Sequence, residues 1–547
     1  MTRKFLFLAA AALSCLVSCV ETDSTLGGNL VPTTETYTFY YAEVPLEGIS
    51  MQMADKLSGF SDSRITIGAI RDEEFGLTTR SSAFALIPMV DTTDFNIGDN
   101  PRFKRFHFAA STDTLSFIDG SQESILQSVR VYELEKALDP EVDSDCNSTV
   151  KHKDKLITRG IPVYSGADSL SFDFTEEFGK KYLQLTKADV SSMKTFLSKF
   201  PGIYMETDLP EGLGGRINML DVQLDYDANY TTVMGNYATL NYSAEFDGVR
   251  KDTSLLFWYG TSAFYDIDSL FTNYTGTFPQ YALNLTGQQT RERAGEATDK
   301  IWVEGGGGLK PVIAAKSLKH LTEEAISRVG GDPRNAIINK ASLIFPFDFP
   351  EDYTEMDRWP YRLSPTCRFI TEDDDGTLSA AFMGLTDSSS SDEDQGDVDR
   401  SLLVYSPDIT YHMQEILKID ETNPDKNTTK NYLKGCYDIW LLVMALEEQV
   451  TVSTTSQETQ EMLNYMAYSS YYNSMYGGGG YGSGYGSYYS NYLNYAMMAQ
   501  MASQAQTSTS YSVELDINRF YRAALHGPAA KKDVPTLQLV FALPNDK

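Results

Sequence analysis

The chain has 547 residues, of which 75 are acidic and 45 basic, so its formal net charge is −30 at pH 7. A surface with this charge repels phosphate backbones and anionic lipid headgroups, which excludes nucleic acid as a binding partner. The length is sufficient for two or three domains.

The first eighteen residues are typical of a bacterial signal peptide. Arg3 and Lys4 form a short basic region, and the apolar stretch 5–17 is shorter than the about 20 residues needed to cross a bilayer core. The segment ends in Leu-Val-Ser-Cys at 16–19, the pattern of a lipobox. We therefore expect signal peptidase to remove residues 1–18 and leave Cys19 as the new N-terminus.

Cys19 is the predicted lipidation site, because its thiol would accept diacylglycerol before the cut. Two or three acyl chains make the attachment effectively permanent. An ordinary cleaved signal with an incidental Cys19 is the alternative. Cys15 is a weaker acceptor than Cys19, because Ala12 is a poorer residue at position −3 than Leu16.

Residues 19–35 lack hydrophobic bulk and periodicity, and we expect them to form a lipid-anchored tether. Glu21 and Asp23 follow the predicted lipidated cysteine closely, which favours transfer to the outer face of an outer membrane. No later segment contains eighteen consecutive apolar residues, so lipid is the only membrane attachment that we expect. The predicted location is the outer membrane, facing the cell surface or otherwise the periplasm.

The first half of the mature chain is rich in predicted strands. Alternating or β-branched and aromatic segments, separated by Gly, Asp, Asn and Pro, predict strands near 36–44, 64–70, 81–89, 103–110, 124–134, 202–207, 216–226, 235–246 and 253–265. A helical insertion is expected at about 174–200, with Phe174, Phe178, Tyr182 and Leu185 on one face.

The second half repeats this pattern. Strands are expected near 300–304, 337–347, 377–384, 400–405, 434–447, 511–517 and 535–543. One helix carries Leu318, Leu321 and Ala325 on one side and stops at the Gly-Gly-Asp-Pro of 330–333, and another spans about 409–418.

The fold class that we predict is mainly β, with two β-sandwich-like antiparallel domains and a few short helices. Few helices between strands favour antiparallel sheets over βαβ units. We place the domain boundary near 247–252, which gives an N-terminal domain at 36–248 and a C-terminal domain at 249–547.

Two segments of the second half look like insertions. Residues 372–399 are acidic, and a solvated loop describes them better than a calcium loop, because Gly396 is out of register with the EF-hand pattern. Residues 463–509 are of low complexity and rich in Tyr and Gly, which predicts a spacer or an adaptable binding loop.

Sequence signatures of catalysis and of metal or cofactor binding are missing. The five histidines (His107, His152, His320, His412 and His526) show no ligand spacing, and neither HExxH nor GxSxG occurs. The GxGxxG at Gly477, Gly479 and Gly482 has no strand before it, and Gly305–Gly308 is better explained as a turn at a strand end than as a phosphate cradle. Cys146, Cys367 and Cys436 lie far apart, which leaves room for one disulfide at most.

Several ordered blocks of the sequence carry a family resemblance. They are residues 23–32, 67–76, 128–134, 200–204, 302–309, 338–343, 524–528 and 535–541. In these blocks the chain resembles the family of Bacteroidota lipoproteins known as domain of unknown function 4270. The resemblance implies an outer-membrane lipoprotein built largely of β-structure, and it supplies no catalytic residue. The acidic loop and the Tyr/Gly-rich segment look like additions to the family pattern.

We therefore expect a non-catalytic lipoprotein that binds a partner, as an accessory subunit of an outer-membrane β-barrel complex for assembly, export or uptake. Cell-surface glycan binding is the alternative, because 12% of the residues are aromatic and aromatic faces stack on sugar rings. A glycoside hydrolase with an unrecognised carboxylate pair is a third reading, since such a pair has no required spacing in sequence. No cofactor and no metal are expected.

Overall fold

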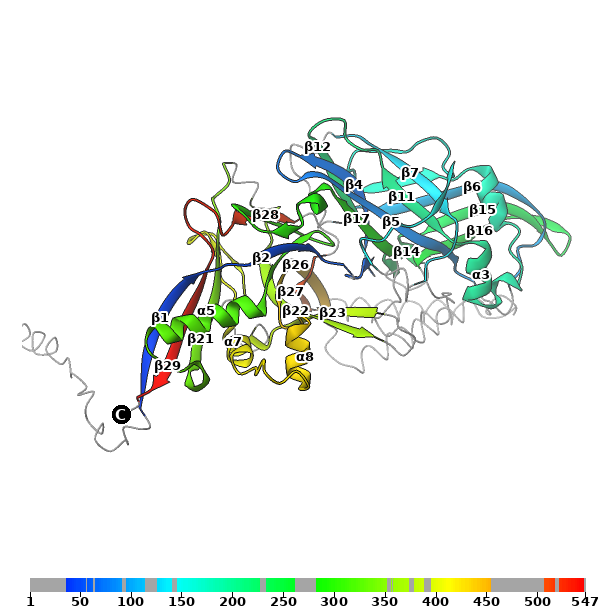
Figure 1. Ribbon diagram of the computed structural model, residues 1–547. Coiled ribbons are helices and arrows are strands. Elements are labelled where there is room, and N and C mark those ends of the chain that lie inside the picture. Colours follow the sequence, from blue (N-terminus) through cyan, green and yellow to red (C-terminus); the bar gives the residue numbers. More distant parts are fainter. Residues whose placement is uncertain are drawn as a thin grey trace, which may run out of the picture.

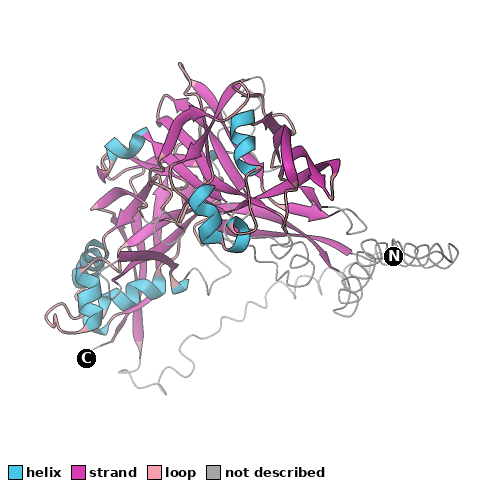
Figure 2. Ribbon diagram, turned by 90° about the vertical axis from the view of Figure 1, so that its right-hand side faces the viewer, coloured by secondary structure: helices cyan, strands magenta, loops and turns pink. Residues whose placement is uncertain are grey.

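Antiparallel strands build most of the chain, and the helices are few and short (Figure 2). The computed structural model describes residues 36–55, 57–61, 64–90, 95–113, 125–139, 145–226, 233–260, 282–351, 356, 358–372, 378–387, 395–453, 506–516 and 521–545. Within them, the expectation of a mainly β protein with antiparallel sheets is confirmed. The strands gather in two lobes (Figure 1). The signal segment, Cys19 and the tether lie outside the described residues, as does 463–505.

The first lobe is organised around a curled sheet of thirteen strands. The long strand β5 is central, because β4 and β17 flank its first half whereas β11 and β16 flank its second half. The strands of this lobe, including the separate hairpin β13–β14, are β3 (Phe60–Ser61), β4 (Arg64–Asp72), β5 (Gly76–Pro88), β6 (Asp99–Ser111), β7 (Gln127–Leu134), β8 (His152–Leu156), β9 (Val163–Tyr164), β10 (Ser169–Asp173), β11 (Ile203–Thr207), β12 (Gly214–Asp221), β13 (Leu224–Tyr226), β14 (Val233–Gly235), β15 (Ala238–Phe246), β16 (Val249–Gly260) and β17 (Ala282–Gln288).

The helical insertion expected at about 174–200 is present in this lobe. It consists of α2 (Glu176–Tyr182), the 3-10 turn η3 (Asp189–Ser191) and α3 (Met193–Lys199). Thr175 and Ser192 cap the two α-helices by accepting hydrogen bonds from backbone amides of their first turns. The predicted apolar face is buried in an aromatic core, where Tyr182 meets Phe106 edge-on with ring centroids 5.3 Å apart.

The second lobe contains a five-stranded sheet, a seven-stranded sheet and a two-stranded pair. The five-stranded sheet has the order β1 (Tyr37–Pro45), β29 (Thr536–Pro544), β21 (Ile337–Pro346), β25 (Val404–Tyr405) and β24 (Val398–Asp399). The seven-stranded sheet contains β18 (Gly295–Glu296), β2 (Ile49–Met53), β20 (Leu309–Ile313), β26 (Ile439–Ser453), β22 (Arg362–Glu372), β23 (Leu378–Gly384) and β27 (Gln506–Leu515).

The remaining pair of the second lobe joins β19 (Lys300–Glu304) to β28 (Arg522–His526). Its helices are α5 (Ala315–Arg328), α7 (Thr410–Leu417) and α8 (Asn427–Leu433), with the 3-10 turns η4 (Gln289–Arg293) and η5 (Pro333–Asn335). The side of α5 that carries Leu318, Leu321 and Ala325 is buried in the core of this lobe, as expected.

Each lobe has its own hydrophobic core, and the cores divide the chain differently from the expected boundary. The first core draws its residues from between 65 and 282, and the second from 44–53 and from between 297 and 543. The boundary that we placed near 247–252 falls in the turn at Asp247 and Gly248, between the paired strands β15 and β16. Both turn residues have positive φ, so the sequence signal marked a hairpin turn and not a linker.

Buried His412 gives stability a dependence on pH. Its Nε2 lies 3.0 Å from the carbonyl oxygen of Tyr437, and burial lowers its pKa from 6.5 to about 4. The unfolded chain therefore binds more protons between these pH values, so the folded state loses stability as pH falls through this window. We predict that between pH 7 and pH 5 the protein loses about 2 kcal/mol more than a His412→Gln variant, which keeps a donor for Tyr437. Urea unfolding at both pH values measures this, and equal losses in the two proteins would contradict it.

Candidate functional site between the two lobes

Four charged side chains are buried where the lobes meet, and we call them the junction cluster. Arg80 comes from β5 of the first lobe, whereas Glu304, Lys310 and Asp516 come from the second lobe. None of the four is more than 4% exposed. Two cations and two carboxylates balance one another, which a buried cluster needs because an uncompensated buried charge is costly.

The Gly305–Gly308 turn forms the wall around Lys310. The Lys310 ammonium donates to the carbonyl oxygens of Glu304, Gly306 and Gly308, the last two at 2.8 and 3.0 Å. A Cβ on Gly305 would overlap the Asp516 carboxylate. The glycines are therefore required by close packing, and the turn joins β19 to β20.

Side chains of the first lobe close this turn from the other side. The Asn147 amide donates to the carbonyl oxygen of Gly307 at 3.1 Å, and a Cβ on Gly307 would overlap that amide. The Thr290 hydroxyl at the lobe boundary donates to the Glu304 carboxylate. Hydrogen bonds donated by neutral side chains therefore add to the charge interactions that hold the junction.

Burial shifts Lys310 and Glu304, two opposite charges of the junction cluster, toward their neutral forms. It lowers the pKa of Lys310 to about 8 and raises the pKa of Glu304. Burial also raises the pKa of the neighbouring Cys146 thiol to about 11, so this thiol is protonated and a poor nucleophile. The arrangement is suited to fixing the lobes and not to proton transfer with solvent.

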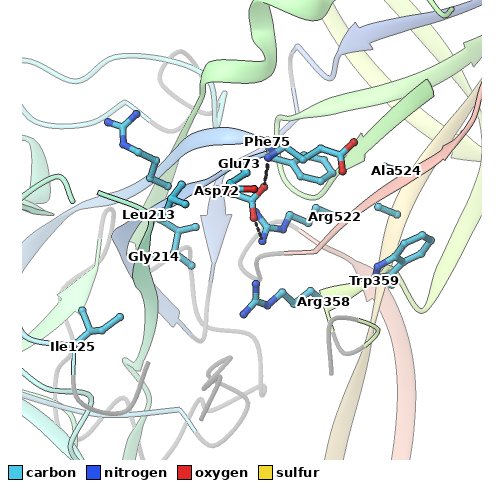
Figure 3. A pocket seen from close by; sticks show the side chains of 14 residues that line it. Asp72, Glu73, Phe75, Ile125, Leu213, Gly214, Arg358, Trp359, Arg522 and Ala524 are labelled. Carbon is cyan, nitrogen blue, oxygen red and sulfur yellow. Dashed lines mark hydrogen bonds and ion pairs between the residues drawn. The ribbon is translucent and has the colours of Figure 1, made fainter. Parts of the chain in front are cut away.

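A cleft of about 610 Å³ opens between the lobes (Figure 3). The turn that follows β4 reaches into it, and Asp72 at the end of β4 forms an ion pair with Arg522 of β28, with Nη2 2.7 Å from Oδ2. Glu74 of the same turn pairs with Lys300 of β19. These two ion pairs connect the lobes across the cleft.

Arginine and aromatic side chains line this cleft together. Arg71 lies on the first-lobe side, and Arg358, Trp359 and Arg522 lie on the second-lobe side. The Arg522 guanidinium lies over the Phe75 ring, 5.1 Å from its centroid. A cleft with a volume in the range of small-molecule sites, lined by charged groups of both signs and by aromatic side chains, can bind and orient a ligand.

A second surface feature is a row of exposed aromatic residues on β1. Tyr37, Phe39 and Tyr41 are 46%, 65% and 64% exposed, whereas Tyr40 and Ala42, the neighbours of Tyr41, pack against the core. β1 is an edge strand of its sheet, paired with β29 alone among the described strands. It runs to the same end of the second lobe as the C-terminus (Figure 1). We call these three residues the aromatic row.

The histidines and cysteines singled out in the sequence do not come together in one site among the described residues. The five histidines are spread over both lobes, and no group of three or more possible metal ligands occurs in the described part of the chain. Cys146, Cys367 and Cys436 are all buried and free, so none of them forms a disulfide. The GxGxxG segment lies outside the described residues.

The acidic segment 372–399 is described only in part. Residues 378–384 form β23, and farther along Asp397 forms an ion pair with Arg362 of β22. Gly396 adopts a φ of 90°, and its carbonyl oxygen accepts a hydrogen bond from the Leu363 amide. This end of the segment is therefore bound to the sheet by hydrogen bonds.

The residues that form the junction and the cleft carry no recognisable sequence pattern. Three of the blocks that carry the family resemblance nevertheless meet here: 67–76 holds Arg71 and Asp72, 302–309 holds Glu304 and the glycine turn, and 524–528 completes β28. The meeting of these three blocks is the signal in the sequence that could have pointed to this site. Among the helices that the structure describes, none is long and apolar enough to span a membrane. No protein-family model, curated protein or solved structure matches this chain.

Replacement of Lys310 tests the junction. We predict that Lys310→Met lowers the free energy of unfolding by about 3 to 5 kcal/mol, because three buried carbonyl oxygens lose their donor and two nearby buried carboxylates lose a compensating charge. Lys104→Met is the matched control, since Lys104 pairs with Asp252 on the surface and its loss costs less than about 1 kcal/mol. Urea unfolding followed by circular dichroism compares them, and equal effects would show that the junction cation is dispensable.

Proposed function

We propose that this chain is a non-catalytic, lipid-anchored protein of the outer membrane that docks on a β-barrel partner as an accessory subunit of an assembly, export or uptake complex. In this proposal the body consists of two β-sandwich-like domains, residues 1–18 are removed and Cys19 carries the lipid. Palmitate or similar acyl chains hold the body at the membrane. The resemblance in the ordered sequence blocks supports the same assignment.

The observation that carries the docking proposal is the aromatic row. Exposed apolar side chains in a cluster on an edge strand are costly in water and mark surfaces that are covered by a partner. The predicted tether, residues 19–35, directly precedes β1 in the sequence, so a lipid at Cys19 would hold Tyr37, the first residue of the aromatic row, within about 60 Å of the membrane plane. A barrel protein in the same membrane is the partner that such a surface reaches.

The state of the cleft carboxylates also supports a binding role. A glycosidase needs two acidic groups, one of which is held protonated. Asp72 and Glu74 are instead each held in an ion pair with a cation from the opposite lobe. Glu73 is the remaining carboxylate of the cleft lining.

Glycan binding is a second candidate function, favoured by Trp359. This indole lines the cleft and is held by Phe347, with ring centroids 4.7 Å apart. An indole ring that is held in place in a cavity is suited to stack on a sugar ring. The two candidates use different surfaces, so one experiment can separate them.

The test is capture of the lipoprotein from outer membranes in mild detergent, with co-purifying proteins identified by mass spectrometry. We predict that the wild type recovers a stoichiometric barrel protein and that a Tyr37→Ser, Phe39→Ser, Tyr41→Ser variant recovers at most about a tenth as much, because the apolar contact is lost. The control replaces three other exposed apolar residues, Leu209, Val249 and Leu402, with serine.

Recovery of the wild-type chain alone would contradict the docking proposal. Equal loss of the partner in both triple variants would also contradict it, because the aromatic row would then have no special part in binding.

A further inference from the structure

The cleft between the lobes differs in charge from the rest of the molecule. The chain as a whole repels anions, yet three guanidinium groups, those of Arg71, Arg358 and Arg522, line this one cavity. Among the three, Arg71 gives the strongest indication of a bound anion, because its Nε is buried and has no hydrogen-bond partner among the described residues. A buried donor without an acceptor costs free energy that a bound acceptor would recover.

Two of the three acidic residues of the lining are already paired with cations, one of which is the lining residue Arg522. Asp72 accepts from the amides of Glu74 and Phe75 and holds Arg522, and Glu74 holds Lys300. Glu73 alone among the lining carboxylates has no ion pair with another described residue. Burial and the nearby charge of Arg522 lower the pKa of Arg358, whereas Asp72 opposes this shift. An anion in the cleft would relieve this repulsion between guanidinium groups.

The arrangement of the side chains indicates what shape the anion has. Arg358, Arg522 and Trp359 lie on one side of the cleft, and Leu213 and Gly214 lie on the other (Figure 3). Arg358 and Trp359 both line the cleft, so a ligand that carries both an acid group and a flat face can contact both of them. A carboxylate carried on a flat-faced ring satisfies both groups, and guanidinium binds carboxylate in a two-point geometry.

We propose that the cleft binds an acidic glycan, with Arg71 and Arg358 holding the carboxylates of uronate residues and Trp359 stacking on a sugar ring. Arg522 is a positioning residue, because its ion pair with Asp72 and its contact with the Phe75 ring hold it in place in the cleft lining. The proposal deepens the glycan candidate given above and does not depend on a barrel partner.

The test is isothermal titration calorimetry of the full mature lipoprotein in detergent with oligogalacturonate. The methyl ester of the same oligomer is the uncharged comparison. We expect the acid to bind at least about tenfold more tightly than the ester, because each charge-assisted hydrogen bond contributes on the order of a tenfold factor. Arg71→Gln and Arg358→Gln should each weaken binding of the acid by about tenfold and leave binding of the ester unchanged.

Arg334→Gln is the matched control. Arg334 pairs with Asp332 on the surface, its side chain is 87% exposed and it is remote from the cleft lining, so its loss should leave affinity unchanged. Arg71→Lys and Arg358→Lys keep the charge and should retain part of the affinity. These four cleft variants should also keep the wild-type unfolding transition, which separates lost binding from lost folding.

Three results would overturn the proposal: no binding of oligogalacturonate, equal binding of its ester, or full affinity in Arg71→Gln and Arg358→Gln. Binding of an aspartate-rich peptide in place of the sugar, lost in the same variants, would also overturn it and assign the cleft to a peptide. Capture of a barrel partner by the two glutamine variants reports on the docking proposal separately, because the aromatic row is intact in them.

Discussion

The buried junction cluster is the constraint on which the relation of the two lobes depends. Desolvation of four charges costs several kcal/mol for each ion, so the cluster is tolerated only when every charge finds its partner. Arg80 comes from one lobe and Glu304, Lys310 and Asp516 from the other. A shift of one lobe relative to the other would leave these charges buried without compensation, and the junction therefore favours a single arrangement.

The cleft follows from this fixed arrangement. The strands that supply its walls pair with strands that supply the junction, since β4 pairs with β5 and β28 pairs with β19. Ion pairs that cross the cleft add modest stability where they are exposed to solvent. A cavity whose walls are held by buried groups loses little conformational freedom when a ligand enters, which favours binding.

Much of the fold was predictable because most strands lie at a boundary between core and solvent and therefore alternate. β1 and β29 show this clearly, and so do the helix faces around Phe178 and Leu318. β20 was missed because it is buried on both sides and carries Lys310 and Pro311, so it has no alternation. α8 was missed because its sequence, NTTKNYL, is mostly polar and lacks an apolar period. The turn at Asp247 and Gly248 looked like a linker between domains, because hairpin turns and linkers are both rich in residues such as Asp and Gly.

The site was much less predictable than the fold. Lys310, Arg80 and Asp516 are charged residues that the sequence places far apart, and only the topology brings them together. The Gly305–Gly308 turn could be recognised as a strand end, but its role as a wall around an ammonium group depends on residues from the other lobe. The aromatic row was visible as a strand, whereas its exposure depends on which face of the sheet the core covers.

Native-state hydrogen exchange of the Gly305–Leu309 segment tests the central claim most directly. The amides of Gly305 and Gly306 donate to the carbonyl oxygens of Tyr521 and Asp516 at 2.8 and 2.7 Å, inside the junction. If the junction fixes the lobes, these amides exchange as slowly as those of the core residues of β5, because side chains of the first lobe such as Asn147 close this turn and must leave before solvent reaches it. Exchange as fast as that of an exposed turn, such as the one at Asp247 and Gly248, would show that the lobes move freely and would contradict the account.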